Sequence, residues 1–131
     1  MAVFGSTDDM YEVLGNLWKE LFKDKEWASK FRESNLTIKF TIDSPSGEIW
    51  LLPDKEESVV CGKVDRKPDI EMFLKGDDCH KFWMKELNLP LALATGKIKA
   101  KGPVNKILKF LPMLKSAYEM YPKIAREHKI I

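Results

Sequence analysis

The sequence predicts an α+β domain in which helices cover one face of a five-stranded, mostly antiparallel sheet. Three observations favour this class. Residues 8–34 place apolar side chains at the three- and four-residue spacings of helices, and residues 36–75 change to the two-residue alternation of strands. Helical spacing then returns, interrupted by one short alternating run at residues 97–101. Segregated runs of helix and strand are typical of α+β domains.

The composition is that of one globular domain. The 131 residues suit a single core, and 44% hydrophobic and 32% charged residues separate the chain from disordered proteins. We expect a single domain over residues 1–131, with helices in 1–33, strands in 34–75, and further helices and the last strand in 76–131. The start, MAVFGSTDDMYEV, lacks the basic and apolar regions of a signal peptide, and only two cysteines are present. A reducing, cytoplasmic setting is therefore expected.

The first helix is predicted from an apolar stripe. Ser6 or Thr7 can cap it, and the carboxylates of Asp8 and Asp9 suit the positive end of its dipole. A second short helix is expected around Trp27 and Phe31, which lie four residues apart. The stripe of the first helix consists of Met10, Val13, Leu14, Leu17, Trp18, Leu21 and Phe22.

Residues 36–75 predict four strands. Alternation over residues 36–42 marks a strand buried on one face, and SPSG then provides the chemistry of a tight turn. GEIWLLP and SVVCGKV follow as two more strands, which completes an antiparallel meander. After the polar segment DRKP, DIEMFLKG reads as the fourth strand.

Residues 77–102 predict two helices and the fifth strand. DDCHKFWMKEL reads as a helix that begins at Asp77 or Asp78, and LNLPLALAT as a small helix with Pro90 in its first turn and Gly96 at its end. GKIKAK then reads as a strand. By its two-residue period, one face carries lysines and the other Ile98 and Ala100. Lysines on a strand also discourage edge-to-edge aggregation, which alone would account for them.

The segment after Gly102 carries more apolar residues than one helix face needs. One helical stripe includes Ile107 and Leu114, and a neighbouring stripe includes Phe110. Pro112 removes a backbone amide and should bend or split the helix. Such a segment either packs against two partners or roofs a cavity above the sheet, and the second alternative implies an apolar ligand.

The order of these motifs resembles the signature of the sterol carrier protein type 2 lipid-transfer family. PDIEMFL, an acidic helix start, and LNLPLALATGKIKAKGP follow one another as in that family, over about residues 34–116. The resemblance implies a domain that encloses a hydrophobic tunnel for sterols, fatty acids, fatty acyl-CoA or phospholipids, without catalytic residues, cofactor or metal. The chain departs from the family in the spacing of Asn88 and Pro90, in its longer tail, and in ending with HKII instead of a peroxisomal tripeptide.

The resemblance also suggests site residues by position. An anionic headgroup or membrane surface would meet the face of Lys97, Lys99 and Lys101, or else Lys106 and Lys109. The tail could cap the opening, pair with another chain or lie along the surface, and the oligomeric state stays open. The tunnel lining would come from Trp83, Leu87, Leu91, Leu93, Ile107, Phe110, Leu111 and Leu114.

Other functions find less support. His80 and His128 are the only histidines, and neither has the spacing of a metal site or catalytic triad. The aromatic residues of the basic half lie on apolar rows and are not interleaved with lysines, as nucleic-acid binding would require. The alternative to a lipid carrier is a small interaction or regulatory module that has the same fold and fills the tunnel with its own side chains.

Overall fold

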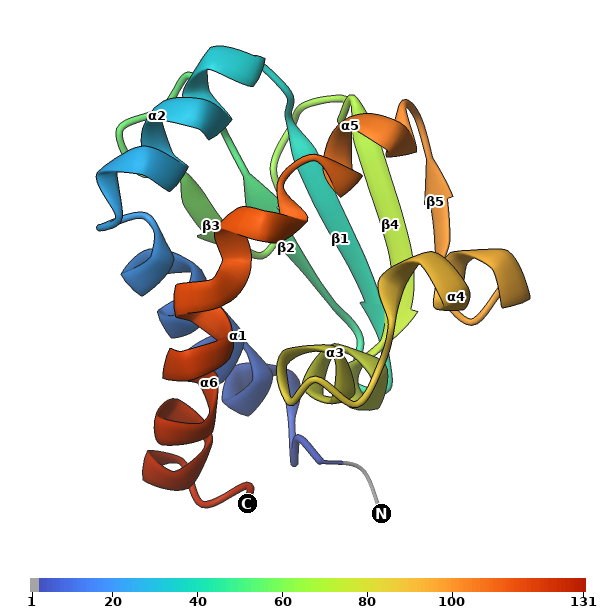
Figure 1. Ribbon diagram of the computed structural model, residues 1–131. Helices are drawn as coiled ribbons and strands as arrows, with labels where there is room; N and C mark the ends of the chain where they lie inside the picture. The colour runs from blue at the N-terminus through green and yellow to red at the C-terminus, as the bar shows by residue number, and fades with distance from the viewer. Residues whose placement is uncertain (1–2) are drawn as a thin grey trace.

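The computed structural model describes residues 3–131 (Figure 1). Among these residues, none of the helices combines the length and apolar character that crossing a bilayer requires. In chain order the elements are α1 (Thr7–Leu21), α2 (Lys25–Ser34), β1 (Ile38–Asp43), β2 (Gly47–Leu51), β3 (Val59–Cys61), β4 (Ile70–Lys75), α3 (Gly76–Trp83), α4 (Leu89–Thr95), β5 (Lys99–Lys101), α5 (Val104–Leu108), the 3₁₀ helix η1 (Leu111–Leu114) and α6 (Lys115–Glu127).

The strands form one sheet in the order β3-β2-β1-β4-β5. β1, β2 and β3 make the predicted antiparallel meander, and β5 pairs antiparallel with β4. β4 instead pairs with β1 in parallel, with Ile38 opposite Ile70. The predicted α+β class with a mostly antiparallel sheet is therefore confirmed. The parallel pair was not predicted, because alternation along a strand is the same in either pairing direction.

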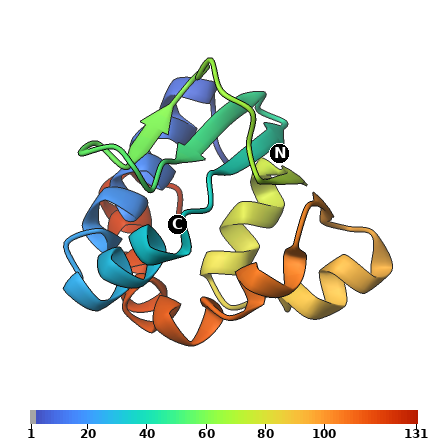
Figure 2. The same ribbon diagram turned by 90° about the horizontal axis from the view of Figure 1, so that it is seen from above.

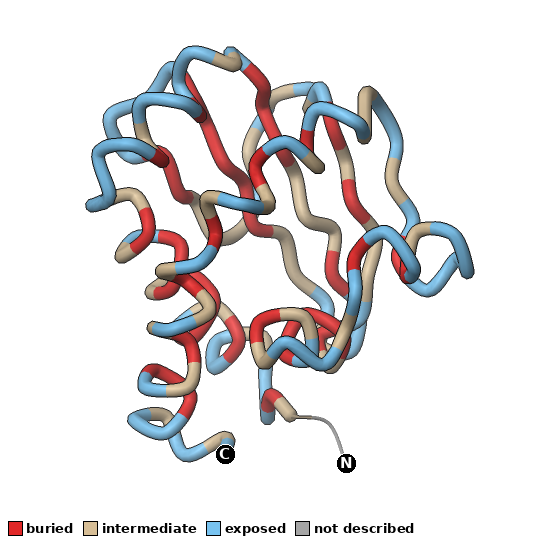
Figure 3. Tube along the Cα trace, in the orientation of Figure 1, coloured by how far each residue is buried: buried red, intermediate tan, exposed pale blue. Residues whose placement is uncertain are grey.

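The sheet buries one face against the helices. Seen from above, α3, α4 and α5 lie on one side of the sheet (Figure 2). Ile38 and Ile42 of β1 are buried and border the apolar space between the sheet and the helices, and Figure 3 shows where along the chain buried residues lie. On the opposite face Lys39 Nζ lies 3.7 Å from Glu48 Oε1 and 3.5 Å from Glu71 Oε2. The alternation read from the sequence thus separates an apolar face from a polar one.

Local signals set most helix ends. Ser6 caps α1 by accepting a hydrogen bond from the amide of Asp9 at 3.1 Å, as predicted. Asn88 caps α4, and Gly96 ends it in the left-handed conformation. α3 differs from the prediction, because it begins at Gly76 and ends at Trp83. It ends early since Lys85 adopts a positive φ of 64°, which a continuing helix does not allow.

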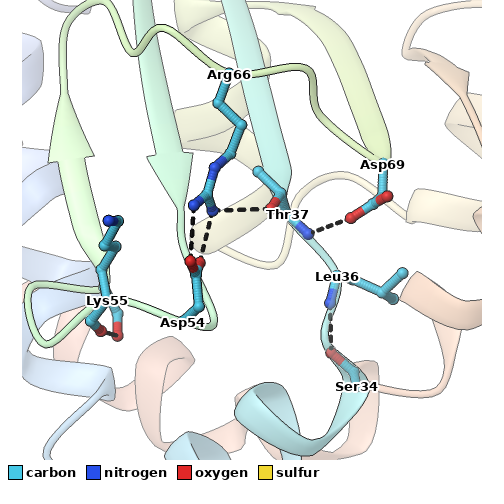
Figure 4. Close-up of polar contacts among 8 residues, drawn as sticks. Ser34, Leu36, Thr37, Asp54, Lys55, Arg66 and Asp69 are labelled. Atoms are coloured by element: carbon cyan, nitrogen blue, oxygen red, sulfur yellow. Dashed lines mark hydrogen bonds and ion pairs between the residues drawn. The ribbon is translucent and has the colours of Figure 1, made fainter.

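Two of the motifs that carry the family resemblance, Pro68-Asp69 and the final glycine of GKIKAKG, contact each other in the structure. Gly102 has a φ of +104°, and a Cβ there would overlap the carbonyl oxygen of Asp69. Asp69 in turn accepts a hydrogen bond from the amide of Thr37 through its carboxylate at 2.8 Å (Figure 4). The backbone amide of Asp69 donates to the carbonyl of Thr37 at 2.9 Å. Pro68-Asp69 and the second glycine of GKIKAKG therefore act together to start β4 and to end β5.

An ion pair holds the loop between β3 and β4. Arg66 donates two hydrogen bonds to Asp54, at 2.6 and 2.7 Å, and its Nη1 also lies 3.3 Å from Thr37 Oγ1 (Figure 4). Hydrogen bonding to Arg66 lowers the pKa of Asp54 to about 2. The pair thereby joins this loop to the loop between β2 and β3, and the contact with Thr37 joins it to the residue before β1.

The C-terminal helical segment is broken near Pro112, as predicted. α5 ends at Leu108, and η1 carries Pro112 in its first turn, where the missing amide is tolerated. Before the break Ile107 and Phe110 are buried, and after it Tyr121 and Ile124 are buried. The buried positions 107, 110, 114, 117, 121 and 124 keep one three- and four-residue spacing across the break, and they are drawn from both apolar stripes of the sequence.

The tail continues α6 and packs against α1. Ala117, Tyr121 and Ala125 are fully buried, and Pro122 lies within the helix without ending it. Figure 1 shows α6 descending beside α1 toward the C-terminus. Of the three alternatives left open by the sequence, none describes this arrangement, because the tail is part of the core.

Candidate functional site

An apolar cavity of about 80 Å³ lies between the sheet and the helices. We call it the central cavity. Its floor is the inward face of the sheet, and α1, α2 and α3 each contribute a tryptophan to its walls. α5 and η1 form its roof. The principal lining residues are Ile38, Phe40, Ile42, Ile49, Leu51, Met72 and Leu74 from the sheet, Trp18, Trp27 and Trp83 from the walls, and Ile107, Phe110, Leu111 and Leu114 from the roof.

The aromatic walls form one connected group. Trp18 stacks on Phe40 at a centroid distance of 5.5 Å and meets Trp83 edge-on at 5.3 Å. Trp27 meets Phe110 edge-on at 5.3 Å. These contacts join the floor, two walls and the roof, so that the cavity is bounded by large rings with fixed geometry.

The structure places five of the eight predicted lining residues on the central cavity: Trp83, Ile107, Phe110, Leu111 and Leu114. Leu87, Leu91 and Leu93 do not border it. Leu87 follows the early end of α3, and α4 turns Leu89 inward. Leu91 is consequently 62% exposed. The structure thus places these three residues away from the central cavity, and the ligand-binding role of all eight residues stays a prediction.

The sheet residues that form the floor of the cavity were not among the site residues predicted from the sequence. The signal was present, because Ile38, Phe40 and Ile42 alternate along β1, and Met72 and Leu74 along β4. Such alternation assigns side chains to a face without saying whether the face is packed solid or borders a void. Trp18 and Trp27 were predicted as core residues for the same reason.

The central cavity has no charged lining residue. Cys79 borders it, and burial raises the pKa of this thiol, so that it stays protonated at neutral pH. Cys61, half-buried on β3, also has a raised pKa because of burial. In residues 3–131 no three His, Cys, Asp or Glu side chains gather as a metal site would require. The cavity therefore offers shape and apolar surface to a ligand.

A groove of about 480 Å³ adjoins the roof and shares Phe110 with the central cavity. We call it the basic groove. It runs between α2 and α5 and contains three lysines and no acidic residue. It is bordered by Lys30, Ser34, Leu36, Lys106, Lys109, Phe110 and Met113.

A second hollow, of about 390 Å³, shares Trp27 with the central cavity. We call it the acidic hollow, since three carboxylates and one lysine surround it. It is bordered by Asp24, Glu26, Trp27, Pro112, Met113, Lys115, Ser116 and Glu119.

The five predicted headgroup lysines fall into two groups. Lys106 and Lys109 border the basic groove. Lys99 and Lys101 are exposed on β5, and Lys97 Nζ lies 3.8 Å from Asp78 Oδ1. Because Ile98 points into the central cavity, the lysines of this strand point away from it. Only the first group adjoins the roof.

Comparison with known proteins is consistent with this fold. Residues 16–115 match the family model described as the SCP-2 sterol transfer family. A fatty acid-binding protein of Yarrowia lipolytica is 27% identical over 124 residues, which are 89% of this chain and 95% of that protein.

Two solved structures have the same fold. The sterol carrier protein domain 2 of Helicoverpa armigera is 19% identical, with a TM-score of 0.62 over 82% of this chain and 89% of that chain. Sterol carrier protein 2 of Aedes aegypti, solved in complex with palmitate, is 19% identical, with a TM-score of 0.53 over 72% and 91%.

Proposed function

Because the chain belongs to the SCP-2 sterol transfer family, we propose that it is a non-catalytic lipid carrier. The hydrocarbon part of a fatty acid, fatty acyl-CoA, sterol or similar lipid would occupy the central cavity. The observation that carries this proposal is the cavity itself, which lies between sheet and helices and is lined by no charged residue. All of its lining residues except Leu14 fall within the segment that matches the family. The binding of fatty acids by relatives from two organisms supports it.

The physical driving force would be burial of hydrocarbon. Each methylene that leaves water contributes about 0.8 kcal/mol, so a long acyl chain gains on the order of 10 kcal/mol gross. Immobilisation of the ligand subtracts a large part of this gain. The remainder is enough for binding by shape alone, without a charged partner inside the cavity.

The central cavity must widen to hold such a chain. Its volume is about 80 Å³, whereas an apolar cavity of roughly 150 Å³ is needed for a molecule as small as benzene. The roof is the part best suited to move, because α5 and η1 have five and four residues and neither has a side-chain cap. Displacement of Phe110 would join the cavity to the basic groove.

The basic groove would hold an anionic headgroup. Lys30, Lys106 and Lys109 could surround a carboxylate or phosphate while the hydrocarbon passes Phe110 into the cavity. The same lysines could contact an anionic membrane surface during loading and release. Lys97, Lys99 and Lys101 lie further from the roof, so we assign them to the surface instead.

Native mass spectrometry of protein purified from cells tests the proposal directly. We expect the mass of the chain plus one lipid, and saturable binding of a fluorescent fatty acid. A clean mass of the chain alone, together with no binding of the fluorescent fatty acid, would overturn the carrier function.

The small volume of the cavity supports a second candidate function. The rings of Trp18, Phe40 and Trp83 border the cavity and contact one another, and in an interaction or regulatory module such side chains would fill the interior. In that case the chain would bind a protein partner and no lipid. The lipid-binding experiment above separates the two functions.

A further inference from the structure

Two buried polar atoms of residues 3–131 lack a hydrogen-bond partner: Trp27 Nε1 and Ser116 Oγ. They belong to elements far apart in the sequence, α2 and the first turn of α6. Both residues nevertheless border the acidic hollow. A buried donor without an acceptor is destabilising, and native proteins leave few of them. Two such atoms, on residues that border one hollow, leave hydrogen-bonding capacity that a ligand atom could use.

The two groups define the chemistry of that atom. The indole N–H can only donate a hydrogen bond, and the serine hydroxyl can donate or accept one. A ligand that satisfies both must therefore offer a hydrogen-bond acceptor, which in the polar end of most lipids is an oxygen. An ammonium group would find carboxylates in this hollow but would leave the indole N–H without an acceptor.

The charges around the hollow exclude an anion. Asp24, Glu26 and Glu119 contribute three carboxylates, against the single ammonium of Lys115. A carboxylate or phosphate placed here would be repelled, whereas the basic groove would attract it. A ligand acceptor at Trp27 and Ser116 would therefore be an uncharged oxygen.

Trp27 borders both the acidic hollow and the central cavity. A hydrocarbon chain in the cavity could thus place its polar end at the indole edge. We propose that Trp27 and Ser116 bind the hydroxyl or carbonyl oxygen of an uncharged lipid whose hydrocarbon part occupies the central cavity. This inference rests on the proposed carrier function. It adds a second opening of the central cavity, at the acidic hollow, which favours lipids with an uncharged polar end over anionic lipids.

The test compares two lipids of equal chain length, 1-tetradecanol and myristate, by displacement of a fluorescent fatty acid. Trp27→Phe and Ser116→Ala should each weaken binding of 1-tetradecanol by about threefold to tenfold, the value of one hydrogen bond. Binding of myristate should change by less than about twofold in Ser116→Ala, and in Trp27→Phe by no more than it changes in Trp18→Phe, since the myristate headgroup would lie in the basic groove. Two variants are the matched controls. Trp18→Phe removes the same ring atoms from another wall of the cavity, and Ser29→Ala removes a serine hydroxyl from the surface of α2. Trp18→Phe should affect both lipids equally, and Ser29→Ala neither.

Thermal unfolding of the free protein provides an independent readout. Ser116→Ala removes a donor that has no acceptor, so the midpoint should stay equal or rise while affinity for 1-tetradecanol falls. A lower midpoint would show that the hydroxyl has a structural partner, such as water, and would overturn the inference. Equal losses for both lipids, or unchanged binding of 1-tetradecanol by Trp27→Phe and Ser116→Ala, would also overturn it while leaving the carrier function intact. Failure of the wild type to bind either lipid would overturn both.

Discussion

At the residue scale, Leu111 and Leu91 show how similar sequence environments lead to different roles. Leu111 opens η1 and borders the central cavity as well as a hollow between α3 and α4. Leu91 lies on α4 and is 62% exposed. Both are leucines next to a proline in a short helix. Replacing each leucine by tryptophan therefore distinguishes a loss of lipid uptake caused by filling the cavity from a general effect of adding an indole ring.

Leu111→Trp should reduce lipid uptake more than it reduces stability. The larger ring would fill space that the ligand needs, and overpacking costs about 1–3 kcal/mol when the site cannot adjust. We expect at least about a tenfold loss of affinity for a fluorescent fatty acid, which corresponds to about 1.4 kcal/mol. Titration and thermal unfolding of the same preparations provide the measurements.

Leu91→Trp is the matched control and should leave both quantities nearly unchanged. If Leu111→Trp lowers the unfolding midpoint sharply and leaves uptake intact, the cavity is ordinary core and holds no ligand.

His80 links α3 to α6 and makes stability depend on pH. It is 8% exposed, and its Nδ1 lies 2.7 Å from the hydroxyl of Tyr121. Burial lowers the pKa of His80, although the carboxylates of Glu86 and Asp77 act weakly in the opposite direction. In the unfolded chain the same imidazole titrates near pH 6.5. Below that value the unfolded state binds a proton that the folded state does not, so stability falls with falling pH.

Urea unfolding of the wild type and of His80→Gln between pH 5 and 8 measures this contribution. The wild type should lose more stability than the variant as pH falls through the region below about 6.5, by at most about 1.4 kcal/mol per pH unit. Parallel curves for the two proteins would show that His80 does not titrate differently in the folded and unfolded states.

At the scale of elements, the roof differs from the rest of the core. α1 and α6 pack along each other with fully buried residues such as Leu17 and Tyr121. α5 and η1 are short, lack side-chain caps and are flanked by surface hollows. Short helices depend on tertiary packing for their stability, so local opening should occur here first.

Hydrogen exchange should locate this opening and its closure. We expect amides of α5 and η1 to exchange faster than those of α1 and β1 in the free protein, and to slow at least about tenfold when a fatty acid binds. Peptides from the C-terminal half of α6 are the internal reference, because no residue of α6 borders the central cavity. Equal protection of all helices with and without fatty acid would contradict a moving roof.

At the scale of the whole molecule, charge is distributed unevenly around the roof. The basic groove and the acidic hollow lie next to Phe110 and Trp27, which contact each other. A carrier that approaches an anionic bilayer should therefore turn the basic groove toward it, since the lysines are attracted within a Debye length of about 10 Å at 0.1 M salt. The orientation of the protein at the bilayer, and therefore the rate of lipid transfer, would then depend on salt concentration, because salt screens the attraction of the lysines.

Transfer of a fluorescent fatty acid to vesicles containing phosphatidylserine tests this orientation. Lys106→Glu with Lys109→Glu should slow transfer to anionic vesicles several-fold and weaken its salt dependence, with little effect on neutral vesicles. Lys99→Glu with Lys101→Glu is the matched control, with the same change of charge on β5. A larger effect of the β5 pair would assign the membrane contact to the sheet edge.

The sequence by itself determined the local structure. Ser6, Asn88 and Gly96 act within one turn of the helix ends they set, the break at Pro112 follows from a missing amide, and alternation assigned the inward residues of β1. Five of the residues predicted from the family resemblance border the central cavity, and their role in ligand binding stays a prediction.

Only the tertiary structure decided the rest. The parallel pairing of β4 with β1, the packing of α6 on α1, the exposure of Leu91 and the meeting of Trp27 with Ser116 at one hollow all join residues distant in the chain. Periodicity describes which face a residue occupies, and does not describe what lies opposite that face. Whether a void remains there is a property of how the elements pack in three dimensions, and so is the charge at each opening.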